Sequence, residues 1–222
     1  MIELSTRWKE VIPETCVGLL AVKNAPNLKD HPDLKSVREE LEAQLRYRYS
    51  SMDRKSLRDL PVFAAYDAFY RPFKKSYHVQ LQLESVVFKE KPIFSPSALV
   101  SSMFMAELQT GLLTAAPDLT ALAFPLLADV AVGNETYLRL DGSEQMLKEG
   151  DMYIRDQEDI LSSVIYGPDQ RTQICTDTDQ AIFTTYGPQG ISKIQVQEQL
   201  EILESFIKVF SPAAERYLLV VI

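Results

Sequence analysis

The spacing of apolar residues changes near the middle of the 222-residue chain, and this change limits the folds it can adopt. In the first half, apolar residues recur every three or four positions, which is typical of amphipathic helices. This pattern predicts helices over 34–45, from Pro61 to just before Pro72, and from Ala98 to near Gly111. The segment 79–88 fits a strand or a helix, and the pattern leaves both open.

The second half consists mainly of short β-rich runs separated by turn-forming residues. One clear helical stripe follows at 196–210 and is stopped by Pro212, and the apolar tail 217–222 fits a last strand or a turn of helix. The predicted fold class is therefore α+β, with a mainly antiparallel β-sandwich-like core flanked by helices. We expect residues 1–60 to form an N-terminal helical extension that packs on a single unit at 61–222. The predicted strands are 127–132, 136–140, 152–155, 160–166 and 181–186.

The overall composition excludes several classes of function. A net charge of −8 argues against a generally basic nucleic-acid binder, whose affinity would come from neutralising phosphates. Two distant cysteines form no disulfide framework, and two histidines cannot build a His-rich metal centre. Cys175 is interpreted as a small buried residue of a strand. We expect a cytoplasmic protein without a signal peptide, membrane span, metal or cofactor.

The positive charge is concentrated in one part of the chain. Residues 31–91 hold 12 Lys and Arg against 9 Asp and Glu, whereas residues 107–222 hold 7 against 18. Basic side chains beside aromatic ones can hold phosphates and stack bases, although lysines on a solvated face over core aromatics give the same pattern. The candidate RNA contacts are Arg71, Lys74, Lys75, Tyr77, Lys89 and Lys91.

Motifs for catalysis are scarce. The sequence has no Gly-rich phosphate loop, and only His31 and His78 could serve as histidine bases. Each histidine is interpreted first as a surface residue, so the residues alone do not predict an enzyme.

An ordered set of segments, covering about two-thirds of the chain, carries a family resemblance. The chain resembles the B3/B4 domain of the phenylalanyl-tRNA synthetase β chain in a free-standing form. The segments are PVFAAYDAFY (61–70), LESVVFK (83–89), PI (92–93), LV (99–100), LLTAAPDL (112–119), GNETY (133–137), LDG (140–142), GDM (150–152), SVIYG (163–167), and Thr178 with AIFT (181–184).

The resemblance implies a B3/B4-type α+β fold and a role linked to tRNA. In the synthetase this domain hydrolyses tyrosine wrongly attached to phenylalanine tRNA, and that reaction requires no metal. Two features of the editing site are missing here. The segment 115–118 reads Ala-Ala-Pro-Asp without the family's histidine, and no glutamate lies between Glu158 and Glu198, where the family has one near Thr184.

Three functional hypotheses follow from the resemblance. The first is RNA binding, of tRNA or an aminoacyl-tRNA end, without strong catalysis and without DNA or membrane partners. The second is a small-molecule, amino-acid or protein-binding domain that has lost RNA, and the third is a trans-editing hydrolase. Val164 is expected to narrow the pocket. The candidate pocket residues are Asp118, Glu135, Ser163, Val164, Gly167, Asp169, Arg171, Thr178 and Thr184.

Overall fold

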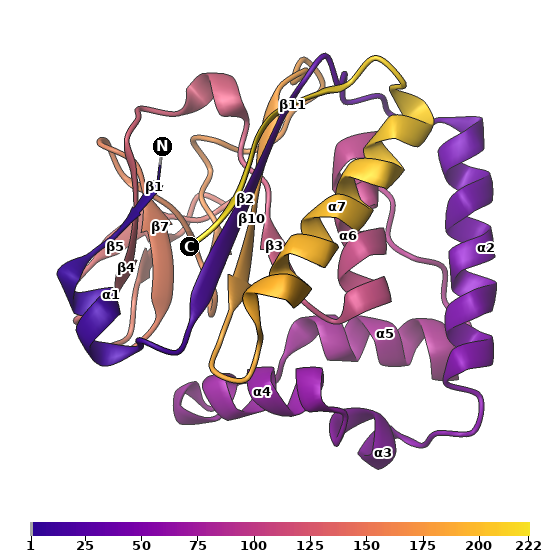
Figure 1. Ribbon diagram of the computed structural model, residues 1–222, viewed down its shortest axis with the longest axis horizontal. Helices are drawn as coiled ribbons and strands as arrows, with labels where there is room; N and C mark the ends of the chain where they lie inside the picture. The colour runs from indigo at the N-terminus through magenta and orange to yellow at the C-terminus, as the bar shows by residue number, and fades with distance from the viewer. Residues whose placement is uncertain (1) are drawn as a thin grey trace.

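The computed structural model describes residues 2–222, which form two large β-sheets and a small two-stranded one, with most of the helices gathered on one side (Figure 1). The two large sheets have five and four strands. The four-stranded sheet lies between the five-stranded sheet and the helices α6 (Ala98–Thr110) and α7 (Lys193–Phe210) (Figure 1). Segregated helices on mainly antiparallel sheets confirm the α+β class.

The five-stranded sheet has the order β1-β4-β7-β8-β9. Strand β1 is parallel to β4, and all other neighbours are antiparallel. The strands are β1 (Ile2–Leu4), β4 (Leu126–Val130), β7 (Met152–Arg155), β8 (Ile160–Ser163) and β9 (Gly167–Pro168).

The four-stranded sheet has the order β11-β2-β10-β3 and is antiparallel throughout. All seven residues of β10 are buried, and β2 is buried except at its last residue. These strands are covered on both faces, so neither sequence alternates between apolar and polar residues. β2 is apolar up to its last residue, and β10 includes two buried threonines. The strands are β2 (Cys16–Lys23), β3 (Leu113–Ala115), β10 (Ala181–Gly187) and β11 (Glu215–Val221).

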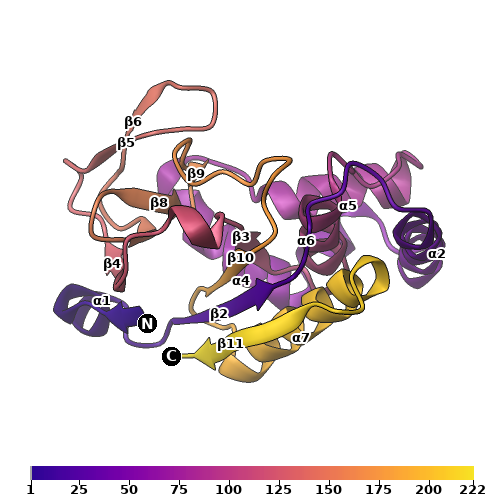
Figure 2. The same cartoon turned by 90° about the horizontal axis from the view of Figure 1, so that it is seen from above.

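The remaining strands, β5 (Thr136–Leu138) and β6 (Glu144–Met146), form a two-stranded ribbon that projects away from the sheets (Figure 2). The other helices surround the α6–α7 pair and the lower end of the sheets. They are α1 (Thr6–Val11), α2 (Pro32–Arg48), α3 (Arg54–Arg58), α4 (Pro61–Tyr70) and α5 (His78–Phe88), with 3₁₀ turns at Arg71–Phe73 and Leu119–Ala121.

Helix α7 packs its apolar stripe against β2 and β10. A capping box at its start pairs the Ser192 side chain with the backbone N–H of Gln195, while the Gln195 side chain accepts from the N–H of Ser192. Gly18 of β2 allows the close approach, because a Cβ there would lie 2.4 Å from the Val196 side chain. A larger residue at position 18 would therefore push α7 away from the sheet.

The helix predictions are confirmed in place and type. Pro61 occupies the first turn of α4, and Gly111 ends α6 in the left-handed conformation at φ 83°. The ambiguous segment 79–88 is helical because Val79, Leu83 and Val86 are buried at helical spacing. The five strand runs of the second half are confirmed. The run 152–155 matches β7 at both ends, and the other four differ from their strands by one to three residues at one or both ends.

Residues 1–60 contribute more than the expected helical extension. Strand β1 pairs with β4, and β2 lies between β11 and β10 in the four-stranded sheet. A unit that began at residue 61 would lack this central strand, and the boundary there remains a prediction. The sequence reading missed β2 because a short apolar run without alternation carries no strand period.

Within residues 2–222, no helix has both the length and the apolar character needed to cross a lipid bilayer.

Candidate functional site: an apolar cavity beside helix α6

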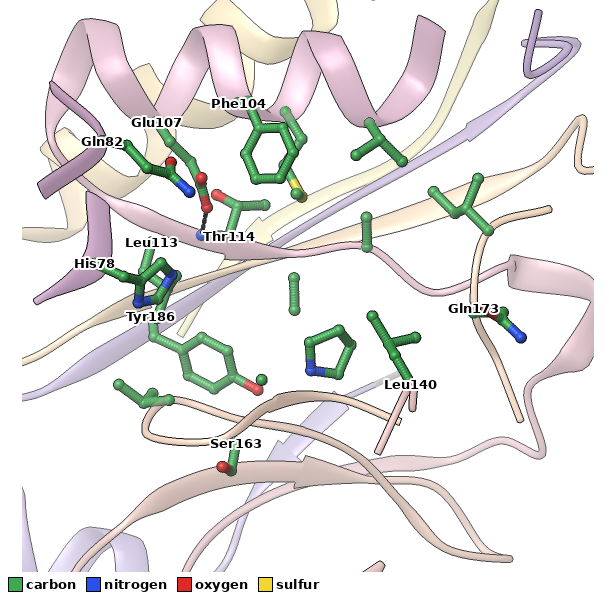
Figure 3. A pocket seen from close by; sticks show the side chains of 18 residues that line it. His78, Gln82, Phe104, Glu107, Leu113, Thr114, Leu140, Ser163, Gln173 and Tyr186 are labelled. Atoms are coloured by element: carbon green, nitrogen blue, oxygen red, sulfur yellow. Dashed lines mark hydrogen bonds between the residues drawn. The ribbon is translucent and has the colours of Figure 1, made fainter. Parts of the chain in front are cut away.

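A cavity of about 360 Å³ lies between helices α5 and α6, the strands β3 and β10, and the segment around β8 and β9 (Figure 3). Its volume falls in the range of small-molecule sites. Most of its wall is apolar, and a few polar groups converge on it. The apolar side chains are those of Val100, Met103, Phe104, Leu113, Ala115, Ala116, Leu140, Val164, Pro168 and Ile174.

Glu107 is the single acidic residue among the residues of 2–222 that line the cavity, and its side chain descends from α6 (Figure 3). It is 1% exposed, and one carboxyl oxygen accepts the backbone N–H of Thr114 at 2.7 Å. The other oxygen, Oε2, has no hydrogen-bond partner among residues 2–222. Burial raises the pKa of Glu107 to about 8, although the bond from Thr114 opposes this shift.

His78, the first residue of α5, also lines the cavity, and the residue as a whole keeps part of its surface exposed to solvent. Tyr70 donates its single hydroxyl proton to the carbonyl of Val164 at 2.7 Å. The contact of 3.4 Å between the Tyr70 hydroxyl and Nδ1 of His78 therefore requires the ring to donate, which leaves the lone pair on Nε2. Desolvation by the surrounding protein, and then the charge of Lys75, lower the pKa of His78, so the ring is neutral near pH 7.

The hydroxyl of Tyr186 closes the cavity on the side of β10. It shares a hydrogen bond of 2.6 Å with the Ser162 hydroxyl, and burial keeps the pKa of Tyr186 far above its ordinary value. The Tyr186 phenol therefore stays uncharged and forms part of the cavity wall rather than acting as an acid. The amides of Gln82 and Gln173 complete the polar lining.

A shallow groove adjoins the cavity, because His78, Gln82 and Phe104 line both. Leu81, Lys91 and Phe94 line the outer part of this groove. The Phe94 side chain is 67% exposed, and its ring centroid lies 5.8 Å from that of Phe104. The groove therefore offers an exposed aromatic face and a cation next to the cavity entrance.

Three of the nine predicted pocket residues, Ser163, Val164 and Gly167, line the cavity. Val164 is buried in the cavity wall, and its narrowing of the space stays a prediction. Gly167 adopts φ 86° at the start of β9, and its carbonyl accepts a hydrogen bond of 2.7 Å from the Tyr137 hydroxyl. The positive φ explains why a glycine stands at this turn.

Two other predicted residues, Asp118 and Thr178, form a buried bond away from the cavity. The Thr178 hydroxyl donates to the Asp118 carboxylate at 2.6 Å and accepts the N–H of Cys175 at 3.0 Å. These bonds hold the turn at 175–178. Cys175 itself is exposed and lies outside any strand, so its interpretation as a buried strand residue is wrong. The local hydrogen bonds of Thr178 favour the turn over an extended strand.

Asp169 and Arg171 do not line the cavity either. Asp169 is buried and accepts from both the N–H and the hydroxyl of Thr172. Arg171 pairs with Asp156 at 2.8 Å and with Glu158 at 3.1 Å. Both residues thus stabilise the loop that follows β9.

Glu135 and Thr184 are the last two of the nine predicted pocket residues. The Glu135 carboxylate accepts backbone N–H bonds from the turn at 132–134, and these bonds hold its pKa below the ordinary value although burial opposes them. Thr184 is buried in β10 opposite Ala115 of β3. Thr184 is not in the cavity wall, but its neighbour Ala115 is.

The predicted RNA contacts fall into two groups. Tyr77 is wrong as a stacking residue, because its ring is buried, stacks on Tyr66 at 4.1 Å, and donates its hydroxyl to the Gly111 carbonyl. The basic residues are all exposed. Lys91 lines the groove, Lys75 lies over the Tyr166 ring at 4.2 Å, and Arg71 pairs with Asp67 at 3.1 Å, whereas Lys74 and Lys89 end the 3₁₀ turn and α5.

Sequence reasoning missed Glu107 as a cavity residue. It interpreted His78 as a surface residue, and His78 is exposed, but its place in the cavity wall was not foreseen. A signal for Glu107 was present, because it continues the buried face of α6 four residues after Met103. A charged residue at an apolar position of a helix is rare unless it is paired or functional. No comparable signal marks His78, Gln82 or Tyr186, since the cavity is assembled from segments distant in sequence.

The comparisons with known proteins find a similar structure but no similar sequence. No family model matches the chain, and no curated protein sequence matches it. Among solved structures, the chain is similar to the crystal structure of an N-terminal fragment of the phenylalanyl-tRNA synthetase β-subunit from Pyrococcus horikoshii, with a TM-score of 0.50 and 12% sequence identity. The match covers 97% of this chain but 49% of that fragment, so the chain spans about half of its length. At this identity the likeness shows a related fold.

Proposed function

We propose that this chain is a B3/B4-type protein that binds the aminoacylated 3′ end of a tRNA. The aminoacyl group would occupy the cavity, and the terminal nucleotides would follow the adjoining groove. The observation that carries the proposal is the continuity of the two spaces, which share the side chains of His78, Gln82 and Phe104. The related fold of a phenylalanyl-tRNA synthetase β-subunit fragment supports it.

The chemistry of the two spaces suits the two parts of such a ligand. The apolar wall of the cavity accommodates a hydrophobic amino-acid side chain. Phe94 offers a face for a base, and Lys91 offers a charge for a phosphate. The net charge of −8 weakens long-range attraction of RNA, but screening confines this effect to about 8 Å at physiological salt.

The test is a titration with total tRNA, charged and uncharged, at low and moderate salt. We expect charged tRNA to bind more tightly, and Lys91→Ala to weaken binding several-fold and flatten its salt dependence by about one unit of slope. Lys9→Ala on α1, which lies on the far side of the molecule (Figure 1), is the matched control and should bind as the parent does. Absence of tRNA binding even at low salt would refute the proposal.

A second variant separates the cavity from the groove. Ala116→Leu would fill part of the cavity, so the preference for charged over uncharged tRNA should disappear while weak binding of uncharged tRNA remains. Ala123→Leu, at a half-buried site outside the cavity wall, is the control. An undiminished preference in a folded Ala116→Leu protein would place the aminoacyl group elsewhere.

Hydrolysis of mischarged tRNA is the second candidate function, and one observation favours it. His78 lines the cavity as a neutral ring with a lone pair on Nε2, which is the form that can deprotonate a water. Deacylation of tyrosyl-tRNA should then be faster with the protein than without it, and His78→Gln should abolish the difference. Equal deacylation rates with and without the parent protein would exclude hydrolysis and leave only the binding function.

A further inference from the structure

Only one of the two carboxyl oxygens of Glu107 has a hydrogen-bond partner among residues 2–222, in a cavity wall that is mostly apolar. One oxygen accepts from Thr114, and the other has no partner among residues 2–222. When Glu107 is ionised, its free oxygen is a buried acceptor without a donor, which costs free energy, and a ligand that supplies the donor recovers that cost. We propose that the cavity selects apolar ligands that carry a protonated amine and a blocked carboxyl group, with the ammonium bound by the free oxygen of Glu107. This inference rests on the proposed function, in which the aminoacyl ester is such a ligand.

The composition of the wall explains why the donor would be a cation. Among residues 2–222, no Lys or Arg lines the cavity, so no side-chain cation competes for the carboxylate of Glu107. Charge-assisted hydrogen bonds are roughly twice as strong as neutral ones, and the buried site screens the pair weakly. An ammonium group therefore fits the free oxygen better than a neutral hydroxyl does.

The same wall disfavours a free amino acid. Its carboxylate would enter a cavity that holds an acid and offers no Lys or Arg. An unpaired buried carboxylate is costly, whereas an ester or amide carries no charge. The cavity would thus distinguish an aminoacyl ester from the free amino acid that is present alongside it.

Binding of the amine should depend on pH, because only the ionised carboxyl pairs with an ammonium. Tyr66, Tyr70 and Tyr77 also face Glu107, and burial keeps these phenols protonated, while the neighbouring His78 is neutral above its lowered pKa. Glu107 is then the group that ionises near pH 8. Affinity for an amine that stays charged should rise from pH 6 through the pKa of Glu107 and level off about one pH unit above it.

The experiment is calorimetric titration of the full chain with four probes. They are L-phenylalanine methyl ester, 2-phenylethylamine, methyl 3-phenylpropionate, which lacks the amine, and free L-phenylalanine. We expect the first two to bind best, and Glu107→Gln to weaken both about 10- to 100-fold while leaving methyl 3-phenylpropionate unchanged or tighter. The Gln side chain keeps an acceptor for Thr114 but places an NH2 donor where the free oxygen stood, so the variant removes both the charge and the acceptor for the ammonium.

Asp151→Asn is the matched control. Asp151 is also fully buried, has a carboxyl oxygen without a partner among residues 2–222, and has a pKa raised to about 7 by burial, but it does not line the cavity. This variant should bind all four probes as the parent does. Thermal unfolding of both variants confirms that each is folded.

Several results would overturn the inference. Equal affinity for the ester and methyl 3-phenylpropionate, no effect of Glu107→Gln, or no binding of any probe would each exclude the ammonium site. Free phenylalanine binding as tightly as its ester would exclude selection for a blocked carboxyl. Amine probes that bind while charged tRNA does not would support the Glu107 site and refute the proposed function, so the two failures are distinguishable.

Discussion

At the residue scale, Tyr66 shows how one side chain supports the cavity wall. Its hydroxyl accepts the backbone N–H of Leu113 at 3.0 Å and donates to the carbonyl of Tyr186. These two backbone groups belong to paired positions of β3 and β10. The phenol therefore caps the end of the ladder that forms one wall of the cavity, and burial keeps its pKa far above the ordinary value.

Removal of the Tyr66 hydroxyl should destabilise the folded protein. Tyr66→Phe would leave a buried N–H without a partner, so we expect the free energy of unfolding to fall by about 1–3 kcal/mol in urea denaturation. Tyr47→Phe is the control. Tyr47 is 85% exposed, so removal of its hydroxyl should change the free energy of unfolding very little. An equal effect of the two substitutions would contradict this role of Tyr66.

Glu107 should also make stability depend on pH. Its pKa is about 8 in the folded state and close to 4.5 in the unfolded chain, so between these values the folded state holds a proton that the unfolded state has lost. The free energy of unfolding therefore falls as pH rises from about 5 to 8. Glu107→Gln should become progressively more stable than the parent over this range, as measured by urea unfolding at several pH values. A constant difference between the two proteins would show that Glu107 is ionised throughout.

At the element scale, the start of α7 decides how firmly the helix holds the four-stranded sheet. Ser192 and Gln195 satisfy each other's backbone N–H groups, and α7 covers β2 and β10. Ser192→Ala should cost about 0.5–2 kcal/mol of unfolding free energy. Ser97 also occupies an N-cap position, but its side chain makes no capping bond, so Ser97→Ala is the control and should cost less. A comparable loss at both caps would argue against the capping box.

Helix α6 links the fold to the site. Its C-terminal turn carries Glu107, and the left-handed Gly111 reverses the chain so that β3 returns alongside β10. The N–H of Thr114 in β3 then reaches the carboxyl of Glu107 at 2.7 Å (Figure 3). The helix, its cap and the strand thus fix the carboxyl by local geometry as well as by packing.

At the scale of the whole molecule, the N-terminal residues form an internal strand of the four-stranded sheet rather than an extension packed on its surface. Strand β2 lies between β11 and β10, and all its residues but the last are buried. A truncated chain starting at residue 61 should lose cooperative unfolding, because β10 and β11 would face each other across the gap left by β2. Near-ultraviolet circular dichroism with urea titration tests this, and native-like cooperative unfolding of 61–222 would support the predicted boundary.

The predictability of the site differed from that of the fold. Helices and turns with strong local signals, such as Pro61, Gly111 and the stripe of α7, could be read from the sequence. The segment around Ser163, Val164 and Gly167 was also identified, and it lines the cavity. Asp118, Asp169 and Arg171 were also predicted to line the pocket, but they stabilise loops instead. A polar residue near a turn has the same sequence pattern whether it stabilises the turn or lines a pocket, so the sequence could not separate the two roles.

The sequence by itself determined the α+β class, most helix positions and the turn-separated strands, because these depend on local periodicity and on residues that restrict the backbone. Only the tertiary structure decided that β2 is a central strand, that Tyr77 is buried, and that Glu107 and His78 meet at one cavity. The physical reason is that burial on both faces removes strand alternation, and that a cavity joins residues far apart along the chain. Local patterns contain neither kind of information.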